Sequence, residues 1–207
     1  MLKKTYMHTP ITIHQSRRTF LISSLALALT ACNKATLKFN SIDITGADYC
    51  RDFKLNDSDG KQRQLADFKG RYVLVFFGFT QCPDICPTAL ARAAAVKQLL
   101  GKDGNKLQVI FISIDPERDT ADLMRAYTQN FDPSFIGLRG TAEQTKQVAD
   151  EFKVFYAKVA TGSSYTMDHS TLSYLFDTTG KIRLAMRHEH SAAQFASDIR
   201  QLMQHAP

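Results

Sequence analysis

Two long apolar runs on either side of a helix-like segment constrain the fold of this chain more than any other feature. Residues 72–77 are a continuous apolar run rich in aromatic and β-branched side chains, and residues 107–114 are a second, largely apolar run. Such runs are typical of strands buried on both faces of a sheet. Residues 87–100 between them have apolar positions at near-helical spacing, with proline first and Gly101 just past the end. This pattern predicts a helix, and two buried strands joined by a helix indicate a parallel α/β sheet.

Strands and helices continue to alternate after residue 114. Asp119 is expected to cap a helix that runs to about residue 130, and residues 135–138 are a predicted short strand. Thr141 and Gln144 have the spacing of a capping box. This spacing predicts a further helix that ends near residue 152.

The C-terminal third has a different pattern. Residues 155–159 and 172–176 are predicted strands, and residues 177–180 (Asp-Thr-Thr-Gly) predict a hairpin turn into a strand over residues 182–186. Ser191 is expected to cap a last helix with one apolar face. A βαβ half joined to a ββα half is the plan of a thioredoxin-like fold. We therefore predict an α/β protein with a central mixed sheet flanked by helices.

The N-terminal segment has the pattern of an export signal. Arg17 and Arg18 precede thirteen residues without a charge, too few to cross a bilayer, which needs about 20. Residues 29–32 (Leu-Thr-Ala-Cys) resemble a bacterial lipobox, in which the cysteine, here Cys32, becomes the lipidated first residue of the mature protein. An ordinary cleaved signal after a chance arginine pair is the alternative. Residues 16–21 resemble the twin-arginine motif, and both this route and general export remain open.

These observations predict three parts of the chain. Residues 1–31 are an expected lipoprotein-type signal, residues 32–41 a tether, and residues 42–207 one folded domain. The expected location is the bacterial periplasm, with the protein anchored to the cell membrane through Cys32.

The excess of basic residues does not indicate a nucleic-acid partner. The chain has 26 basic and 20 acidic residues, and four of the basic ones lie in the first 31 residues, which contain no acidic residue. The remaining residues carry 22 basic and 20 acidic side chains. A balance this even gives no electrostatic case for a polyanion, so we expect no nucleic-acid partner.

The cysteine count excludes a disulfide scaffold. Beyond Cys32 the chain has Cys50, Cys82 and Cys86, and three thiols cannot all pair within one monomer. A close pair with one leftover thiol indicates a redox or metal site. Cys50 is expected to be a small buried hydrophobic residue rather than a redox partner.

The close pair lies where a predicted buried strand leads into a predicted helix. Cys82 and Cys86 each precede a proline, so we expect both in an extended, exposed loop with Cys86 near the start of the helix. The N-terminus of a helix lowers the pKa of a nearby thiol and so favours the thiolate. Three intervening residues allow the sulfurs to bind an ion or to form an internal disulfide. A purely static disulfide would stabilise little, because its loop is so short.

Two thiolates leave most metals short of ligands, so a third ligand is expected elsewhere in the chain. His169 lies before a predicted strand of the antiparallel half, and a thioredoxin-like fold brings such loops towards the active-site helix. His188 and His190 could share one face, although a solvated loop is the expected environment. The residues alone leave two interpretations of His169 open, a metal ligand or an ordinary polar loop residue.

Three separated motifs together resemble the Sco/SenC family of copper proteins that assemble cytochrome c oxidase. They are residues 82–87 (Cys-Pro-Asp-Ile-Cys-Pro), residues 113–120 (Ser-Ile-Asp-Pro-Glu-Arg-Asp-Thr) and residues 168–170 (Asp-His-Ser). The resemblance covers about residues 42–204. It implies a thioredoxin-like fold that binds one copper ion per monomer through Cys82, Cys86 and His169. Cys50 departs from what this family usually has in that segment.

The chemistry of the implied ligands agrees with copper. Two soft thiolates and one imidazole suit Cu(I), whereas zinc would prefer a fourth ligand. Asp84 and Asp168 are expected either to steer the loops and the cation through nearby contacts or simply to be solvated. Met167 is expected to pack rather than to lend its thioether. The transferred oxidation state, Cu(I) or Cu(II), stays open.

The resemblance implies a membrane-anchored periplasmic copper metallochaperone. It would take copper from a periplasmic donor and deliver it to the binuclear copper site of cytochrome c oxidase subunit II. One alternative is a thiol-disulfide oxidoreductase that reduces the cysteines of the acceptor, and another is a copper or redox sensor. The enzyme alternative requires Cys82 and Cys86 but is indifferent to His169, whereas the copper interpretation requires all three residues.

Overall fold

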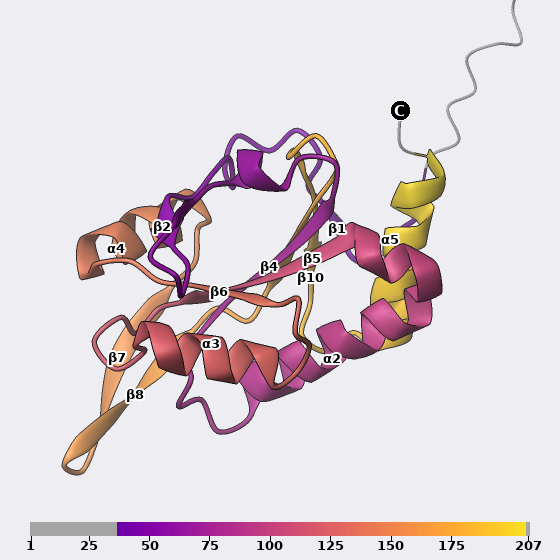
Figure 1. Cartoon of the computed structure of the whole chain (residues 1–207). Coiled ribbons are helices and arrows are strands. Elements are labelled where there is room, and N and C mark those ends of the chain that lie inside the picture. Colours follow the sequence, from indigo (N-terminus) through magenta and orange to yellow (C-terminus); the bar gives the residue numbers. More distant parts are fainter. Residues whose placement is uncertain (1–36, 206–207) are drawn as a thin grey trace, which may run out of the picture. The chain divides into compact units, whose positions relative to one another are not determined.

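The two apolar runs form neighbouring parallel strands in the middle of a six-stranded sheet (Figure 1). The computed structural model describes residues 37–205. All residues of β4 (Tyr72–Gly78) and β5 (Leu107–Ser113) are buried, as expected of central strands covered on both faces. The short strand β6 (Ile136–Leu138) pairs with β5 in the same direction and ends the sheet on that side.

The other half of the sheet is antiparallel. β9 (Ser173–Phe176) pairs with β4, and the predicted Asp-Thr-Thr-Gly turn leads from β9 into β10 (Ile182–Met186). β1 (Ile42–Asp43) pairs with β10 and forms the other edge, so the strand order is β1-β10-β9-β4-β5-β6. This mixed sheet with its flanking helices confirms the predicted thioredoxin-like fold.

In the described part of the chain, four α-helices and several short elements complete the fold (Figure 1). Gly101, with a φ of 61°, ends the first of these helices as the sequence predicts. The capping box of Thr141 and Gln144 is also present. The helices are α2 (Ile85–Leu100), α3 (Ala121–Gln129), α4 (Ala142–Glu151) and α5 (Ala192–His205), and the short elements are β2 (Leu55–Asn56), β3 (Gln62–Arg63), η2 (Leu65–Phe68) and η3 (Gly101–Lys106). Among the described residues, none of the helices is long and apolar enough to span a membrane.

The expected cap of α3 was wrong by one residue. Thr120, not Asp119, caps the helix, because its side chain accepts a hydrogen bond from the backbone N–H of Leu123. Asp119 is instead almost wholly buried, and its carboxylate accepts hydrogen bonds from Thr80 and Ser113. Because Asp119 is buried and bonded to these two side chains, it does not cap α3 as its position in the sequence suggested.

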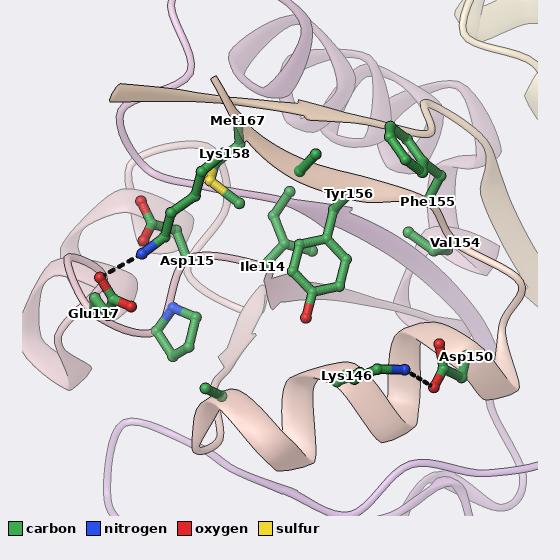
Figure 2. A pocket seen from close by; sticks show the side chains of 13 residues that line it. Ile114, Asp115, Glu117, Lys146, Asp150, Val154, Phe155, Tyr156, Lys158 and Met167 are labelled. Carbon is green, nitrogen blue, oxygen red and sulfur yellow. Dashed lines mark hydrogen bonds and ion pairs between the residues drawn. The ribbon is translucent and has the colours of Figure 1, made fainter. Parts of the chain in front are cut away.

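A second correction concerns the segment between α4 and β9. β7 (Tyr156–Thr161) and β8 (Ser164–His169) form a hairpin of their own, separate from the main sheet, and β8 is not predicted by the sequence analysis. Most residues of β8 are only partly buried or exposed, so its apolar pattern is weak. An apolar cavity of about 480 Å³ lies between the β7 side of this hairpin and α4 (Figure 2).

Candidate metal centre

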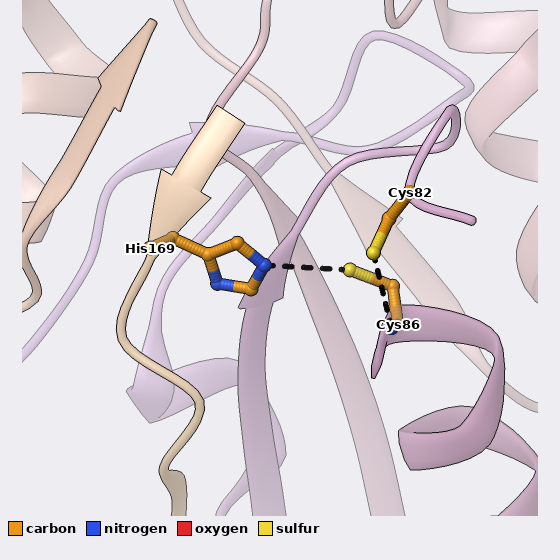
Figure 3. Close-up of side chains that lie close together, drawn as sticks. All are labelled: Cys82, Cys86 and His169. Carbon is orange, nitrogen blue, oxygen red and sulfur yellow. Dashed lines mark hydrogen bonds between the residues drawn. The ribbon is translucent and has the colours of Figure 1, made fainter. Parts of the chain in front are cut away.

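Three side chains predicted from the sequence as ligands converge in the structure (Figure 3). The sulfur atoms of Cys82 and Cys86 and a ring nitrogen of His169 all lie within 4.8 Å of one another. Nε2 of His169 lies 3.6 Å from Sγ of Cys86. Among residues 37–205, this is the cluster of cysteine, histidine and carboxylate side chains whose donor atoms could hold a metal ion.

The topology of the sheet explains why His169 reaches the cysteines. β9 runs antiparallel to β4, and Ser173 at the start of β9 pairs with Phe76 near the end of β4. The start of β9 therefore lies beside the end of β4, so the segment that enters β9 and the loop that leaves β4 are neighbours at the same end of these strands. The first segment carries His169 and the second carries Cys82, so 87 residues of separation in sequence become a contact in space.

Cys86 does not lie in the exposed loop that the sequence analysis expected. It belongs to the first turn of α2, which begins two residues before Pro87, and its side chain is fully buried. Proline is tolerated in the first turn because the N–H that it lacks would have no partner within the helix there. The preference of residues before proline for extended backbone is thus overridden, and Asp84 occupies the cap position.

The two thiols have opposite acid–base properties. Sγ of Cys82 is half-buried in the loop and accepts a hydrogen bond from the backbone N–H of Cys86 at 3.4 Å. The pKa of Cys82 is lowered to about 3, first by the hydrogen bond from the Cys86 thiol and further by hydrogen bonds from backbone N–H groups, against the effect of burial. The pKa of Cys86 is raised, because its proton is held between the two sulfurs and because it is buried. The reduced pair therefore carries one proton, on Cys86, near neutral pH.

The ring of His169 presents a lone pair to the sulfurs. Its Nδ1 lies 2.8 Å from the carbonyl oxygen of Ser170 and donates the hydrogen bond, since a carbonyl can only accept. The neutral ring then has an unprotonated Nε2, the atom that faces Cys86. The rings of Phe76 and Phe79 pack against the imidazole in T-shaped geometry, with centroids 6.1 and 6.0 Å from its own.

The carboxylates of the two aspartates beside the ligands make no hydrogen bond to the ligand side chains among the described residues. Asp84 is exposed and its carboxylate lies 3.5 Å from the hydroxyl of Thr88. Asp168 is also exposed and alternates along β8 with His169, so it points to the opposite face of the hairpin. A direct steering contact from either carboxylate to a ligand side chain is therefore absent from the described part of the chain.

The remaining candidates lie outside the cluster. His188 is held against α2, where its Nδ1 accepts a hydrogen bond from Arg92 at 3.0 Å, and burial lowers its pKa. His190 is not part of the cluster either. Met167 is buried and packs, as expected, and it lines both the large cavity under the hairpin and a smaller one of about 240 Å³ at Cys82 and His169. Cys50 is buried, and its burial raises the pKa of its thiol to about 12, which agrees with the expected role as a small hydrophobic residue.

The groups that fix the loop before Cys82 were not predicted from the sequence. The buried carboxylate of Asp119 accepts hydrogen bonds from the hydroxyl and backbone N–H of Thr80, at 2.6 and 3.2 Å, and from the hydroxyl of Ser113. Desolvation raises the pKa of Asp119. Its signal was the charged segment 113–120 directly after a buried strand, which the sequence analysis used only as a motif.

The donor set permits two kinds of chemistry. Two sulfurs and one neutral imidazole nitrogen are soft donors that suit a monovalent copper ion, and three ligands without a fourth fit zinc less well. The same sulfurs are close enough for redox chemistry, in which the Cys82 thiolate attacks a disulfide of another molecule. His169 is needed for the first chemistry and has no required role in the second.

Known proteins that are similar to this chain agree with the family resemblance seen in its sequence motifs. A family model described as SCO1/SenC matches residues 43–204. The SCO2-like protein of Rickettsia felis is 44% identical over 133 residues, which cover 63% of this chain and 65% of that protein. The match thus spans slightly less than two thirds of the length of this relative.

Solved structures resemble the chain in sequence and in fold. The structure of Bradyrhizobium japonicum ScoI with copper bound is 39% identical, has a TM-score of 0.66, and aligns over 72% of this chain and 96% of that one. The solution structure of apo Sco1 from Thermus thermophilus is 32% identical, has a TM-score of 0.72, and aligns over 81% of this chain and 99% of that one.

Proposed function

Because the chain belongs to the SCO1/SenC family, we propose that it binds one copper ion as cargo through Cys82, Cys86 and His169 and serves the assembly of cytochrome c oxidase. The convergence of two sulfurs and one imidazole nitrogen within 4.8 Å is the observation that carries this proposal. It is supported by the ScoI structure from Bradyrhizobium japonicum, which has copper bound.

The acid–base state of the pair favours binding of a soft cation. Cys82 already supplies a thiolate at neutral pH, and His169 presents a lone pair on Nε2. Only the proton of Cys86 has to leave before both sulfurs can bind the metal ion. With three protein ligands, a ligand from an acceptor protein can add to the cargo ion before a ligand of this chain leaves.

The proposed acceptor is the binuclear copper site of cytochrome c oxidase subunit II, and the proposed source is a periplasmic copper donor. Cys82 and His169 line an open cavity of about 240 Å³, which supports direct transfer between proteins at this surface. The proposed location is the periplasmic side of the cell membrane, through lipidation of Cys32. That residue and the export signal lie outside the described residues, so this part of the proposal rests on the sequence.

The second candidate function is thiol-disulfide exchange with the cysteines of the acceptor. The lowered pKa of the half-buried Cys82 favours it, because a thiolate is the attacking form. The buried Cys86 would then resolve the mixed disulfide, and electrons from the dithiol would reduce the acceptor.

Substitution of His169 separates the two functions. We expect His169→Ala to lose tight copper binding and the charge-transfer absorbance of the Cu(II) form, while its circular dichroism stays unchanged. His188→Ala is the matched control, because this histidine lies outside the cluster and should leave copper binding intact. Wild-type copper affinity in His169→Ala would contradict the proposed ligand set, and disulfide reduction unaffected by His169→Ala would favour the enzyme.

Delivery is tested by mixing the copper-loaded protein with the metal-free soluble domain of subunit II and then separating the two. The proposal predicts copper on the subunit II domain after separation, with loss of transfer when Cys82 and Cys86 are first oxidised to a disulfide, since a disulfide has no thiolate to bind the cargo. Copper that stays with this chain in the presence of a reduced acceptor would contradict the proposed delivery.

A further inference from the structure

The strand that carries His169 is not held by the main sheet. Among the described strands, β8 pairs only with β7, and β7 pairs only with β8. The cysteines, by contrast, lie on the loop and helix that follow the central strand β4. Side-chain contacts between the hairpin and the body therefore have to fix the distance between the histidine and the sulfurs.

One arginine joins these two parts directly. Nη1 of Arg118 donates a hydrogen bond to Oε1 of Gln81 at 3.0 Å and another to the backbone oxygen of Tyr165 at 2.8 Å. Gln81 directly precedes Cys82, and Tyr165 lies four residues before His169 on β8. We call residues 79–84, between β4 and α2, the cysteine loop. Among the described residues, Arg118 is the side chain that hydrogen-bonds to both the cysteine loop and β8.

The guanidinium is fixed by further contacts. Its Nε donates to Oδ2 of Asp115 at 2.5 Å, and its Cζ lies 3.7 Å from the centre of the Tyr165 ring. The hydroxyl of Tyr165 in turn donates to Oδ1 of Asp115 at 2.8 Å. The side chain of Arg118 is only 17% exposed, so these contacts are largely shielded from water. A planar group with donors on several edges can bond to two segments and stack on a ring at the same time, which a lysine cannot do.

A second contact of the hairpin provides a comparison. Lys158 of β7 forms an ion pair with Glu117 at 2.6 Å, but both side chains are about half exposed and neither bonds to the cysteine loop (Figure 2). Exposed pairs of this kind contribute little to stability. This pair joins the hairpin to the same 113–120 segment and also contacts Tyr165 on β8, whose hydroxyl donates to Glu117 at 3.5 Å and whose ring centre lies 4.6 Å from Nζ of Lys158, but it makes no hydrogen bond to the cysteine loop.

We propose that Arg118 is a positioning residue that holds the β8 strand against the cysteine loop and so sets the position of the His169 ring relative to the sulfurs. This inference rests on the proposed function for its copper readouts, whereas its metal-free readout does not. Arg118 itself has no lone pair to give to a metal ion and acts only through Gln81, Tyr165 and Asp115.

The metal-free test uses proton contacts within the reduced apo protein. In the wild type, the nuclear Overhauser effect between the rings of His169 and Phe79 reports the packing seen in the structure. We expect Arg118→Met to lose this signal, because the hairpin is released from the cysteine loop. Lys158→Met, which removes the exposed ion pair, is the matched control and should retain the signal. A retained signal in Arg118→Met would overturn the inference, whether or not copper binds.

The copper test uses the same variants with all three proposed ligands intact. We expect Arg118→Met to bind Cu(I) about 10- to 100-fold more weakly, the usual effect of removing a group that orients a ligand. X-ray absorption should show a weaker nitrogen contribution in this variant and an unchanged one in Lys158→Met. An unchanged affinity and nitrogen contribution in Arg118→Met would overturn the positioning role and leave the proposed function standing. Failure of the wild type to bind copper would instead contradict the proposed function.

A lysine variant separates geometry from charge. Arg118→Lys keeps the positive charge but has neither the planar stack on Tyr165 nor two separated donor edges. We expect this variant to behave like Arg118→Met in both tests. Full recovery of the ring contact and of copper affinity in Arg118→Lys would show that charge alone is sufficient and would overturn the bridging role.

Discussion

At the scale of single residues, the two cysteines of the pair differ more than their spacing suggests. Cys82 is half-buried in a loop, whereas Cys86 is fully buried in the first turn of α2. The proton shared between their sulfurs lowers the pKa of Cys82 and raises that of Cys86. One residue is therefore the reactive, accessible donor, and the other binds or reacts only after its proton is removed.

This difference predicts the pH dependence of alkylation. A pKa lowered to about 3 means that Cys82 remains a thiolate as the pH falls through the range in which ordinary thiols become protonated. An ordinary cysteine, with a pKa of about 8.5, is only about 0.3% thiolate at pH 6. We expect the rate of Cys82 alkylation by iodoacetamide to change little between pH 8 and pH 6, as measured by mass spectrometry of the reduced apo protein.

Cys50 serves as the internal control for that measurement. It is buried, and its pKa is raised to about 12, so it should remain unmodified over the same range in the folded protein. A Cys82 rate that falls about 80-fold between pH 8 and pH 6, in step with a free thiol of pKa about 8.5, would contradict the described arrangement of the pair.

The sequence was sufficient to predict which residues converge but not their environments. The set of Cys82, Cys86 and His169 could be predicted, because the close cysteine pair and the motif around His169 both resemble motifs of the Sco/SenC family. The burial of Cys86 could not, because the local effect of Pro87 favours a loop and only tertiary packing extends α2 past it. Arg118 and Asp119 were equally hidden, since their partners lie on other segments of the chain.

At the scale of elements, the end of β4 and the start of α2 are packed too closely for any side chain at Gly78. A Cβ at this position would lie 2.6 Å from Sγ of Cys86 and 2.7 Å from the ring of Phe111. The absence of a side chain on the last residue of β4 therefore sets how near the first turn of α2 approaches the sheet. This close approach seats Cys86 at the end of the sheet where His169 arrives.

Gly78→Ala is expected to affect both stability and the metal centre. Overpacking of this kind costs about 1–3 kcal/mol of unfolding free energy, and it should displace the Cys86 sulfur and weaken copper binding. Gly137→Ala is the control, because Gly137 lies on β6, a strand that carries none of the three proposed ligands. A Cβ at Gly137 would also be crowded, at 3.1 Å from Met124. Denaturant titration and copper titration of both variants check the prediction, and equal copper affinities in the two would contradict it.

The elements that the sequence predicts well are those with strong periodicity or punctuation. β4, β5 and α4 have buried runs or a capping box, and all three occur where expected. β8 was missed because Ser-Tyr-Thr-Met-Asp-His neither alternates cleanly nor forms an apolar run. The position of β8 is fixed by its pairing with β7 and by contacts such as that of Arg118. Neither interaction leaves a pattern in the local sequence.

At the scale of the whole molecule, the candidate centre joins two parts of the chain that differ in burial and in strand pairing. The cysteines belong to the buried βαβ half, and the histidine belongs to a largely exposed hairpin outside the main sheet. The class of fold could be predicted from the order of strands and helices. The placement of His169 could not be predicted from that order alone, because it depends on the register of β9 against β4 and on side-chain contacts across the hairpin.

The most direct test of the proposed ligand set is X-ray absorption spectroscopy of the Cu(I)-loaded wild type beside His169→Ala. The account predicts a copper ion surrounded by two sulfur atoms and one nitrogen atom in the wild type, with the nitrogen contribution lost in the variant. A wild-type spectrum with sulfur neighbours alone, or a nitrogen contribution that survives in His169→Ala, would contradict it.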